Sequence, residues 1–453
     1  MPLELELARL VSAIGVLAHL SLASSFLGTI ALAVIGEYIW LRRRDQDWLN
    51  LARKFNIVAT IFFGVGAAFG TLVEFGLVTI WSNFIAIIGS AIALPFFLEL
   101  FAFLFEVIFL PLYTFTWNRF SNQWVHWIIG LLAAFGGYYS AYNILAVMSA
   151  LSVAPPGLQL VNLAEQGKNV AGAITWLAVW QNPTDAWNVF WWGANVFIFH
   201  GILAAVILSW SGVAGVVLYL YLKEKKEWQY KLLRVVVPTI AVLVLIEGAV
   251  LGHFQGELVL EHDPLKLAAL EGMFWSGLRV DPLTSFVAYG DFNHQFWGYY
   301  SWPADIRPPE WVSVFYLGFM VGAGILLGIL TAGIGLYFRF GWFKRIVPPL
   351  LKPSVYLIPI LAALASIGGA VSAESGRYPF ILVQSVPSAD GPPQIVGLPV
   401  GPGGLFNPTL QLTPWLAALI IIVEVAMPAL TGYMVYLALV KPPKILKRAL
   451  GEY

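Results

Sequence analysis

The stretch VFWWGANVFIFHGILAAVILSWSGVAGVVLYLYL, residues 189–222, decides the fold of this chain. Its only acidic, basic or histidine residue is His200. An apolar run of roughly 20 residues is long enough to cross a bilayer as a helix. A second such run, residues 10–36, also holds a single ionisable side chain, His19. Because an ionisable group is costly at membrane depth, both histidines are candidates for a redox, proton-transfer or metal site.

The rest of the chain is similarly apolar. Of its 453 residues 59% are hydrophobic and 11% are charged, and the mean hydropathy is +0.78. We therefore expect an all-α, polytopic membrane helix bundle, because only helices and closed barrels satisfy their backbone inside a bilayer. The 25 basic and 25 acidic residues balance, so nothing indicates a nucleic-acid partner. The absence of cysteine excludes disulfides, thiolate haem ligands, iron–sulfur clusters and cysteine nucleophiles.

The hydropathy pattern predicts about nine transmembrane helices. They are expected at about 8–40, 55–79, 93–117, 124–152, 188–222, 232–252, 311–338, 354–373 and 412–439. The stretch 81–95 is too short to cross, and we expect it to lie along the interface before the third span.

The basic residues indicate how the spans are oriented. Most of the 25 lie between alternate spans, in the segments 41–54, 223–234, 339–352 and 441–448. The positive-inside rule then predicts an N-terminus outside and a cytoplasmic C-terminus.

This orientation divides the chain into three parts. Transmembrane helices 1–6 occupy residues 1–252, an outer segment occupies 253–310, and transmembrane helices 7–9 occupy 311–453. The outer segment is rich in aromatic residues, which argues that it is ordered.

Depth along the spans pairs His200 with a methionine. His200 lies about 12 residues into the fifth span and Met320 about 9 into the seventh, a difference of about one helical turn. We therefore expect the two side chains at a similar depth. Imidazole and thioether together form the axial pair of many electron-transfer haems. A methionine within a span also commonly serves only for packing.

Two carboxylates lie within the third span. Glu99 and Glu106 occupy an otherwise aromatic and aliphatic stretch, and their seven-residue separation places both on one helix face. Glu106 lies about 10 Å closer to the cytoplasm. The pattern favours a metal ligand and a proton relay, with a structural buried pair as the alternative. For His19, in the outer half of the first span, the alternative to a ligand is a hydrogen bond to a neighbouring helix.

Further charged residues lie at the ends of spans. Glu74 ends the second span on the outer side, and Glu37 ends the first on the inner side, where we expect a simple interfacial position. Glu374 and Arg377 end the eighth span outside. Their spacing permits a local ion pair.

A series of short motifs completes the pattern. In chain order they are ELARL (6–10) followed by His19, EF (74–75) with WS (81–82), the Glu99/Glu106 helix, FTWNRF (115–120), KLAALE (266–271), MVG (320–322) and GRYPF (376–380). Each is weakly specific alone. Their order, spacing and placement on nine spans resemble subunit I of the cytochrome bd-type quinol:oxygen oxidases over nearly the whole chain, in a divergent form with a short outer loop.

The resemblance implies three haems. These are a low-spin haem b, a high-spin haem b and a haem d, or a further haem b in place of haem d. His200 and Met320 match the axial ligands of the low-spin haem b. His19, Glu99 and Glu374 match ligands of the two high-spin haems, where oxygen is reduced; which haem each would bind stays open.

Five other residues acquire roles from the same resemblance. Glu106 matches a buried carboxylate associated with proton delivery, and Glu74 an acidic residue near the haems. Arg377, in the motif that follows Glu374, is grouped with the cofactor-binding residues. Lys266 and Glu271 match residues of the loop that binds quinol.

The activity implied is that of a terminal oxidase of a respiratory chain in a prokaryotic plasma membrane. It would oxidise membrane ubiquinol or menaquinol at the outer loop and reduce oxygen to water, generating proton motive force without pumping. The resemblance also implies a second large membrane subunit, either subunit II or a paralogue, and in some members small accessory subunits.

Several residues depart from the family pattern. Glu99 and Glu106 are seven residues apart where eight are expected, and Gly318 stands where an arginine would neighbour the low-spin haem. Tyr378 and Phe380 replace a glutamine and a tryptophan.

Two other functions are alternatives to a terminal oxidase. A non-catalytic haem-binding paralogue that scaffolds an active subunit is one alternative. A proton-coupled transporter is another, although transporters of that kind often show repeated halves and no repeat is found here.

Overall fold

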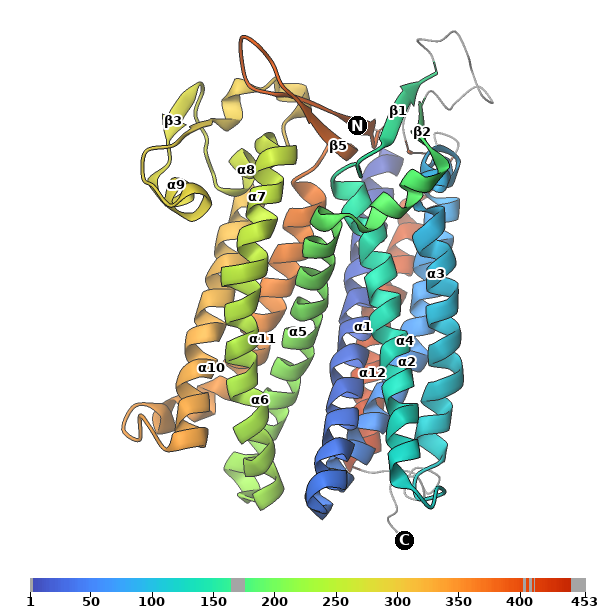
Figure 1. Ribbon diagram of the computed structural model, residues 1–453, viewed down its shortest axis with the longest axis vertical. Helices are drawn as coiled ribbons and strands as arrows, with labels where there is room; N and C mark the ends of the chain where they lie inside the picture. Colours follow the sequence, from blue (N-terminus) through green and yellow to red (C-terminus); the bar gives the residue numbers. More distant parts are fainter. Residues whose placement is uncertain (1–2, 164–175, 402–404, 407–409, 411, 441–453) are drawn as a thin grey trace.

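A computed structural model of the chain describes residues 3–163, 176–401, 405–406, 410 and 412–440. Within these ranges, nine helical segments are long and apolar enough to cross a membrane. They stand side by side in one elongated bundle (Figure 1), which confirms the predicted polytopic helical fold. The side of the membrane that each terminus faces stays a prediction. The basic segment 441–448 lies outside the described residues.

Long helices make up most of the structure. They are α1 (Leu3–Arg43), α2 (Gln46–Thr79), α3 (Ser82–Phe115), α4 (Gln123–Ser152), α5 (Trp192–Glu224), α6 (Glu227–Ile246), α7 (Gly252–His262), α8 (Pro264–Leu270), α9 (Pro282–Tyr289), α10 (Ala323–Phe340), α11 (Val347–Ser375) and α12 (Pro414–Val440). Two segments are π-helical, η2 (Glu247–Leu251) and η5 (Val314–Gly322). Three are 3₁₀ helices, η1 (Pro183–Phe190), η3 (Tyr299–Ser301) and η4 (Ala304–Ile306).

Several helices are longer than the hydropathy pattern predicts, and the third and sixth spans differ most. The prediction of a separate interfacial segment at 81–95 was wrong, because α3 continues through Pro95 without a break. A proline is tolerated inside a membrane helix, where neighbouring groups satisfy the carbonyl that it leaves free. In the sixth span, α6 continues through η2 into α7, so helical structure extends to His262.

The helices form two groups that meet along α1 and α5 (Figure 1). In one group, α1 packs against α2 and α4, and α3 packs against α4. In the other, α5 and α10 both pack against α6 and α11. Buried apolar side chains such as Trp210, Leu233 and Ile334 fill the second group and reach α1. Burial of apolar area and close packing hold these contacts together.

Three short hairpins lie at the end of the bundle where α1 begins (Figure 1). Each pairs two antiparallel strands: β1 (Leu158–Asn162) with β2 (Trp176–Trp180), β3 (Leu278–Val280) with β4 (Gln295–Trp297), and β5 (Phe380–Val386) with β6 (Gln394–Pro399). Around β4, the side chains of Phe296, Tyr299 and Trp302 are buried against Leu265 of α8. Aromatic residues of segment 253–310 thus form much of an apolar core, which also includes Val383 and Ile395 of the β5–β6 hairpin, as expected of an ordered segment.

The spans differ greatly in how much of their apolar surface is covered. In α5 56% of the most apolar window is buried, whereas the corresponding windows of α2 and α12 are 11% and 6% buried. Apolar surface of this extent on a water-soluble protein would mark an interaction site. On these helices it is suited to lipid or to a second membrane subunit.

We expect Gly137→Ala to destabilise the bundle. A Cβ atom at Gly137 of α4 would lie 2.6 Å from Cε1 of Phe26 and 3.2 Å from a carboxylate oxygen of Glu106, so three helices would have to separate. Overpacking of this kind costs about 1–3 kcal/mol and should lower the Tm of the detergent-solubilised protein. Gly64→Ala is the matched control, because its Cβ would meet nothing within 4 Å. A Gly137→Ala variant that melts no lower than Gly64→Ala would contradict the expectation.

Candidate functional site

His200 lies in α5 and faces the sixth span. Its Nδ1 atom is 3.3 Å from Oε1 of Glu247 in η2, and the side chains are 23% and 15% exposed. The Nδ1 atom is buried and makes no hydrogen bond to a described residue. The carboxylate of Glu247 is its ion-pair neighbour.

Met320 lies within the π-helical segment η5, which packs against α11. Its sulfur faces Gly369 of α11, where an added Cβ would approach Sδ to 3.3 Å. A larger residue at Gly369 would therefore crowd the thioether. A Cβ atom added at Gly318, two residues earlier, would meet nothing within 4 Å, so the backbone there tolerates a side chain. His200 and Met320 lie on separate segments, α5 and η5, that both pack against α11.

His19 lies on the α1 face that packs against α2. Its ring fills the space beside Gly70, where a Cβ atom would lie 2.9 Å from Cε1 of the imidazole. The absence of a side chain at Gly70 thus gives His19 its room. Its Nδ1 atom is buried and makes no hydrogen bond to a described residue.

Glu99 and Glu106 share one face of α3, as their spacing predicts, and this face packs against α4. The Ser140 hydroxyl donates to Oε1 of Glu99 at 2.7 Å, while Oε2 is buried without a partner. Glu106 is buried where Gly136 and Gly137 bring α4 close. Small residues let membrane helices approach closely, and here they enclose a carboxylate.

Glu74 lies on α2 and is exposed. Glu99 and Glu106 lie on α3, which packs against α2. The three carboxylates therefore lie on two adjacent helices.

Glu374 and Arg377 form the ion pair that their spacing allows, between Oε2 and Nη2. Arg377 is buried, and its Nη1 also donates to the carbonyl of Leu151 at the end of α4 at 3.3 Å. Oε1 of Glu374 is buried and has no partner. The pair therefore holds one carboxylate oxygen in place and leaves the other free to bind.

Lys266 reaches the same place from the outer segment. Its Nζ donates to the carbonyl of Ala373 at 3.0 Å, at the C-terminal end of α11, and the residue is 7% exposed. A cation stabilises the partial negative charge of a helix C-terminus. Burial lowers the pKa of the Lys266 ammonium, against the opposing effect of Asp263, and burial raises the pKa of Asp263.

Glu271 follows α8 and connects the outer segment to η5. It is hydrogen bonded to the hydroxyl of Tyr316, four residues before Met320. Burial raises the pKa of Glu271, and the hydrogen bond from Tyr316 opposes this effect. The two predicted quinol-loop residues, Lys266 and Glu271, therefore contact two different membrane segments, α11 and η5.

The arrangement defines a membrane protein with ligand-type side chains buried among apolar helices. The family model for cytochrome bd terminal oxidase subunit I matches residues 7–400. The chain is 26% identical over 419 residues to Bacillus subtilis cytochrome bd ubiquinol oxidase subunit 1, covering 84% of each protein. It is 32% identical over 142 residues to Escherichia coli cytochrome bd-II ubiquinol oxidase subunit 1, covering 31% of this chain and 27% of that protein.

The fold shows the same relationship. The structure of bd oxidase from Geobacillus thermodenitrificans matches with a TM-score of 0.77 at 23% identity, covering 96% of this chain and 97% of that chain. This chain belongs to the cytochrome bd terminal oxidase subunit I family. Members of the family use haem cofactors in quinol oxidation and oxygen reduction, and subunit I typically pairs with a subunit II.

The described residues fit haem better than a bare metal ion. No three histidine, aspartate or glutamate side chains among them come together as an ion site would need. Instead, His19, Glu99 and Glu374 each present a buried donor atom without a hydrogen-bond partner. Single donors on separate helices suit haem iron, which the protein holds by axial ligands.

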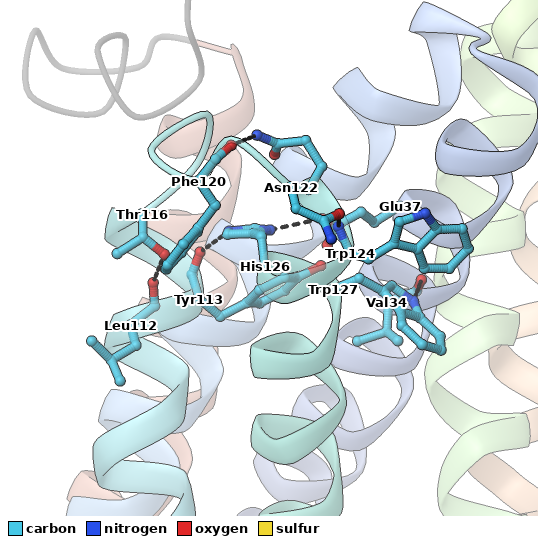
Figure 2. A network of polar contacts seen from close by, with 11 residues as sticks. Val34, Glu37, Leu112, Tyr113, Thr116, Phe120, Asn122, Trp124, His126 and Trp127 are labelled. Carbon is cyan, nitrogen blue, oxygen red and sulfur yellow. Dashed lines mark hydrogen bonds and ion pairs between the residues drawn. The ribbon is translucent and has the colours of Figure 1, made fainter.

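A buried histidine–glutamate pair that was not predicted lies near the end of α1 that Arg43 closes (Figure 2). Glu37 is not exposed as a simple interfacial residue would be: it and His126 of α4 have side chains 0% exposed, with Nδ1 2.7 Å from Oε1. The His126 Nε2 atom donates to the carbonyl of Tyr113 at 2.9 Å. Both ring nitrogens of His126 thus face oxygen atoms. Nε2 carries a proton, and the other proton of the pair lies either on Nδ1 or on the carboxylate of Glu37. The apolar surroundings of His126 in the fourth span were the signal available.

Two carboxylates in the later spans were also missed. Glu247 is the acidic partner of His200 described above. Glu424 of α12 packs against Gly15 of α1, one turn before His19. Each is the only acidic residue within its stretch of apolar sequence, and the rule that singled out the two histidines applies equally to them.

We expect the Glu37–His126 pair to stabilise the bundle as a unit. His126→Leu or Glu37→Leu alone leaves a buried polar group unpaired, which costs about 3–5 kcal/mol. The double variant leaves neither group and should lose less than the two single variants together. Thermal denaturation of the four proteins in one detergent measures this coupling. Strictly additive losses in stability would contradict it.

Proposed function

We propose that this chain is the quinol-oxidising, oxygen-reducing subunit of a respiratory terminal oxidase in a prokaryotic plasma membrane. The observation that supports this function most directly is the set of unpaired, buried donor atoms at His19, Glu99 and Glu374. In the family, residues at these positions would face haem. In the proposed orientation the N-terminus faces the outside. The three hairpins and the segment 253–310 then also lie on the outer side.

The ligand assignment follows from these positions. His200 and Met320 would hold a low-spin haem b, and His19, Glu99 and Glu374 would hold a high-spin haem b and a haem d or a further haem b. When bound, these groups supply one-electron transfer from quinol and the reduction of oxygen to water. Arg377 keeps Glu374 in place through the ion pair between their side chains.

The outer segment 253–310 would bind the quinol. Glu271 is half-buried, is hydrogen bonded to Tyr316 and lies five residues after Lys266 in the sequence. A carboxylate in this position accepts a proton when a quinol hydroxyl is oxidised. Lys266 serves the same site by fixing the outer segment to the end of α11.

The carboxylates of α3 would deliver the protons that are consumed in the reduction of oxygen. Glu106 is deeper from the outer side than Glu99, and the two lie on one face of α3 with Ser140 beside Glu99. Protons consumed in forming water would pass from Glu106 toward Glu99, with Glu74 contributing negative charge nearby. Because protons are released outside and taken up from the cytoplasm, turnover separates charge without a pump.

A second large membrane subunit, subunit II or a paralogue, would complete the enzyme, in some members with small accessory subunits. The least covered spans, α2 and α12, offer the apolar surface for such contacts. Membrane quinol, of the ubiquinol or menaquinol class, and oxygen are the substrates.

We expect His200→Ala to remove the low-spin haem b signal selectively. The substitution deletes one axial donor, whereas His19, Glu99 and Glu374 remain. Reduced-minus-oxidised spectra with pyridine-haem analysis of the purified complex measure the loss and count the haems by type. His294→Ala, at a histidine stacked on Tyr289 in the outer segment, serves as the control. An unchanged low-spin signal in His200→Ala would overturn the ligand assignment, and a wild type without haem would overturn the proposed function.

We expect Glu271→Gln to impair quinol oxidation without loss of haem. The amide keeps a hydrogen-bond acceptor for Tyr316 but takes up no proton, so kcat with a soluble quinol should fall by about 10²–10⁴-fold. Tyr316→Phe removes only the hydrogen bond and should have the smaller effect. Quinol-dependent oxygen consumption and haem spectra of the same preparations test this. Equal activity of Glu271→Gln and wild type would exclude Glu271 from proton transfer.

A further inference from the structure

The sixth span contains one carboxylate that no family motif quoted above includes. Glu247 is the only acidic residue between Glu227 and Glu257. It lies at the first position of η2, within a stretch that is long and apolar enough to cross a membrane. A carboxylate inside the membrane is costly and commonly functional. The contacts of Glu247 therefore indicate its role.

Among the described residues, the ion-pair neighbour of Glu247 is His200. Oε1 of Glu247 lies 3.3 Å from His200 Nδ1, and α5 and η2 pack against each other. Oε2 of Glu247 and Nδ1 of His200 are both buried, and neither atom makes a hydrogen bond to a described residue. The two groups therefore face each other, and no competing hydrogen bond occupies Nδ1.

The backbone turns this carboxylate toward α5. The N–H of Gly252 bonds to the carbonyl of Glu247, five residues earlier, which widens the helix by one residue. Such π-helical turns are rare and often occur at functional sites. The only other π-helical segment in the described part of the chain is η5, which carries Met320. The two irregular turns thus supply the partner of His200 and the proposed second axial ligand.

We propose that Glu247 is the positioning residue of the His200 haem ligand. The inference rests on the proposed function, in which His200 binds the low-spin haem. Glu247 accepts the Nδ1 proton, which fixes the tautomer and the plane of the ring and leaves Nε2 to bind iron. Carboxylate partners of metal-bound histidines act in this way and raise the basicity of the ligand.

This contact also affects the reduction potential. A carboxylate on Nδ1 increases electron donation by the imidazole and places negative charge near the iron, so it favours the oxidised haem. Gly318 acts in the same direction, because the positive charge of the family's arginine is absent there. The carboxylate of Glu247 and the absence of an arginine at Gly318 together lower the reduction potential of the low-spin haem. That potential is lower than it would be with a neutral partner on His200.

The test is a redox titration of the low-spin haem b in the purified complex. In Glu247→Gln, an amide of nearly the same size replaces the carboxylate. We expect the one-electron equilibrium to shift about tenfold toward the reduced haem, a rise of about 59 mV. A shortened carboxylate, Glu247→Asp, should shift it in the same direction by less.

Glu37→Gln provides the matched control. It changes the carboxylate of the other buried histidine–glutamate pair, which the His126 contact places on α1 and α4, and it should leave the low-spin potential unchanged. Should Glu247→Gln fail to assemble, Glu247→Asp decides the question. Potentials equal to wild type in the assembled Glu247 variants would overturn this inference alone. A wild type that lacks low-spin haem would overturn the proposed function as well.

Discussion

The cost of placing polar groups in an apolar membrane interior governs this structure. Every buried ionisable side chain must find a partner within the protein or bind a ligand, because lipid offers neither water nor counter-charge. The described side chains divide accordingly. Glu37 pairs with His126 through one carboxylate oxygen, and Glu374 pairs with Arg377 in the same way. His19 and Glu99 keep a buried atom without a hydrogen-bond partner, and they are among the side chains to which we assign haem.

The same constraint explains the close approach of certain helices. Glu106 is enclosed by two glycines of α4, and His19 occupies the room left by Gly70 of α2. A small residue opposite a polar one lets the helices seal that group from lipid and still leaves space for its side chain. The irregular π-helical turns at Glu247 and Met320 serve the same end, since each turns one side chain out of the regular helical pattern.

Much of the fold could be predicted from hydropathy alone, because a transmembrane span is recognisable by its length and apolar composition. The largest differences lie at residues 81–95, which were predicted to lie along the interface and instead begin α3, and beyond residue 252, where helical structure continues to His262. At the site, a fixed seven-residue spacing predicted the common face of Glu99 and Glu106. Contacts between helices far apart in sequence, such as His200 with Glu247 and Glu37 with His126, depend on rotation about each helix axis. No single-span pattern contains that information.

The hydrogen bond from Lys266 to the end of α11 couples the position of the outer segment energetically to the end of that helix. The outer segment cannot move away from the bundle without withdrawing its ammonium from the Ala373 carbonyl, next to Glu374. Any molecule that tightens the end of α11 therefore also holds the outer segment down, and any molecule that lifts the segment loosens that helix end to the same degree. This reciprocity is a thermodynamic necessity for two coupled sites. Under the proposed function, binding of quinol at the outer segment and binding of a ligand at Glu374 would therefore be energetically coupled.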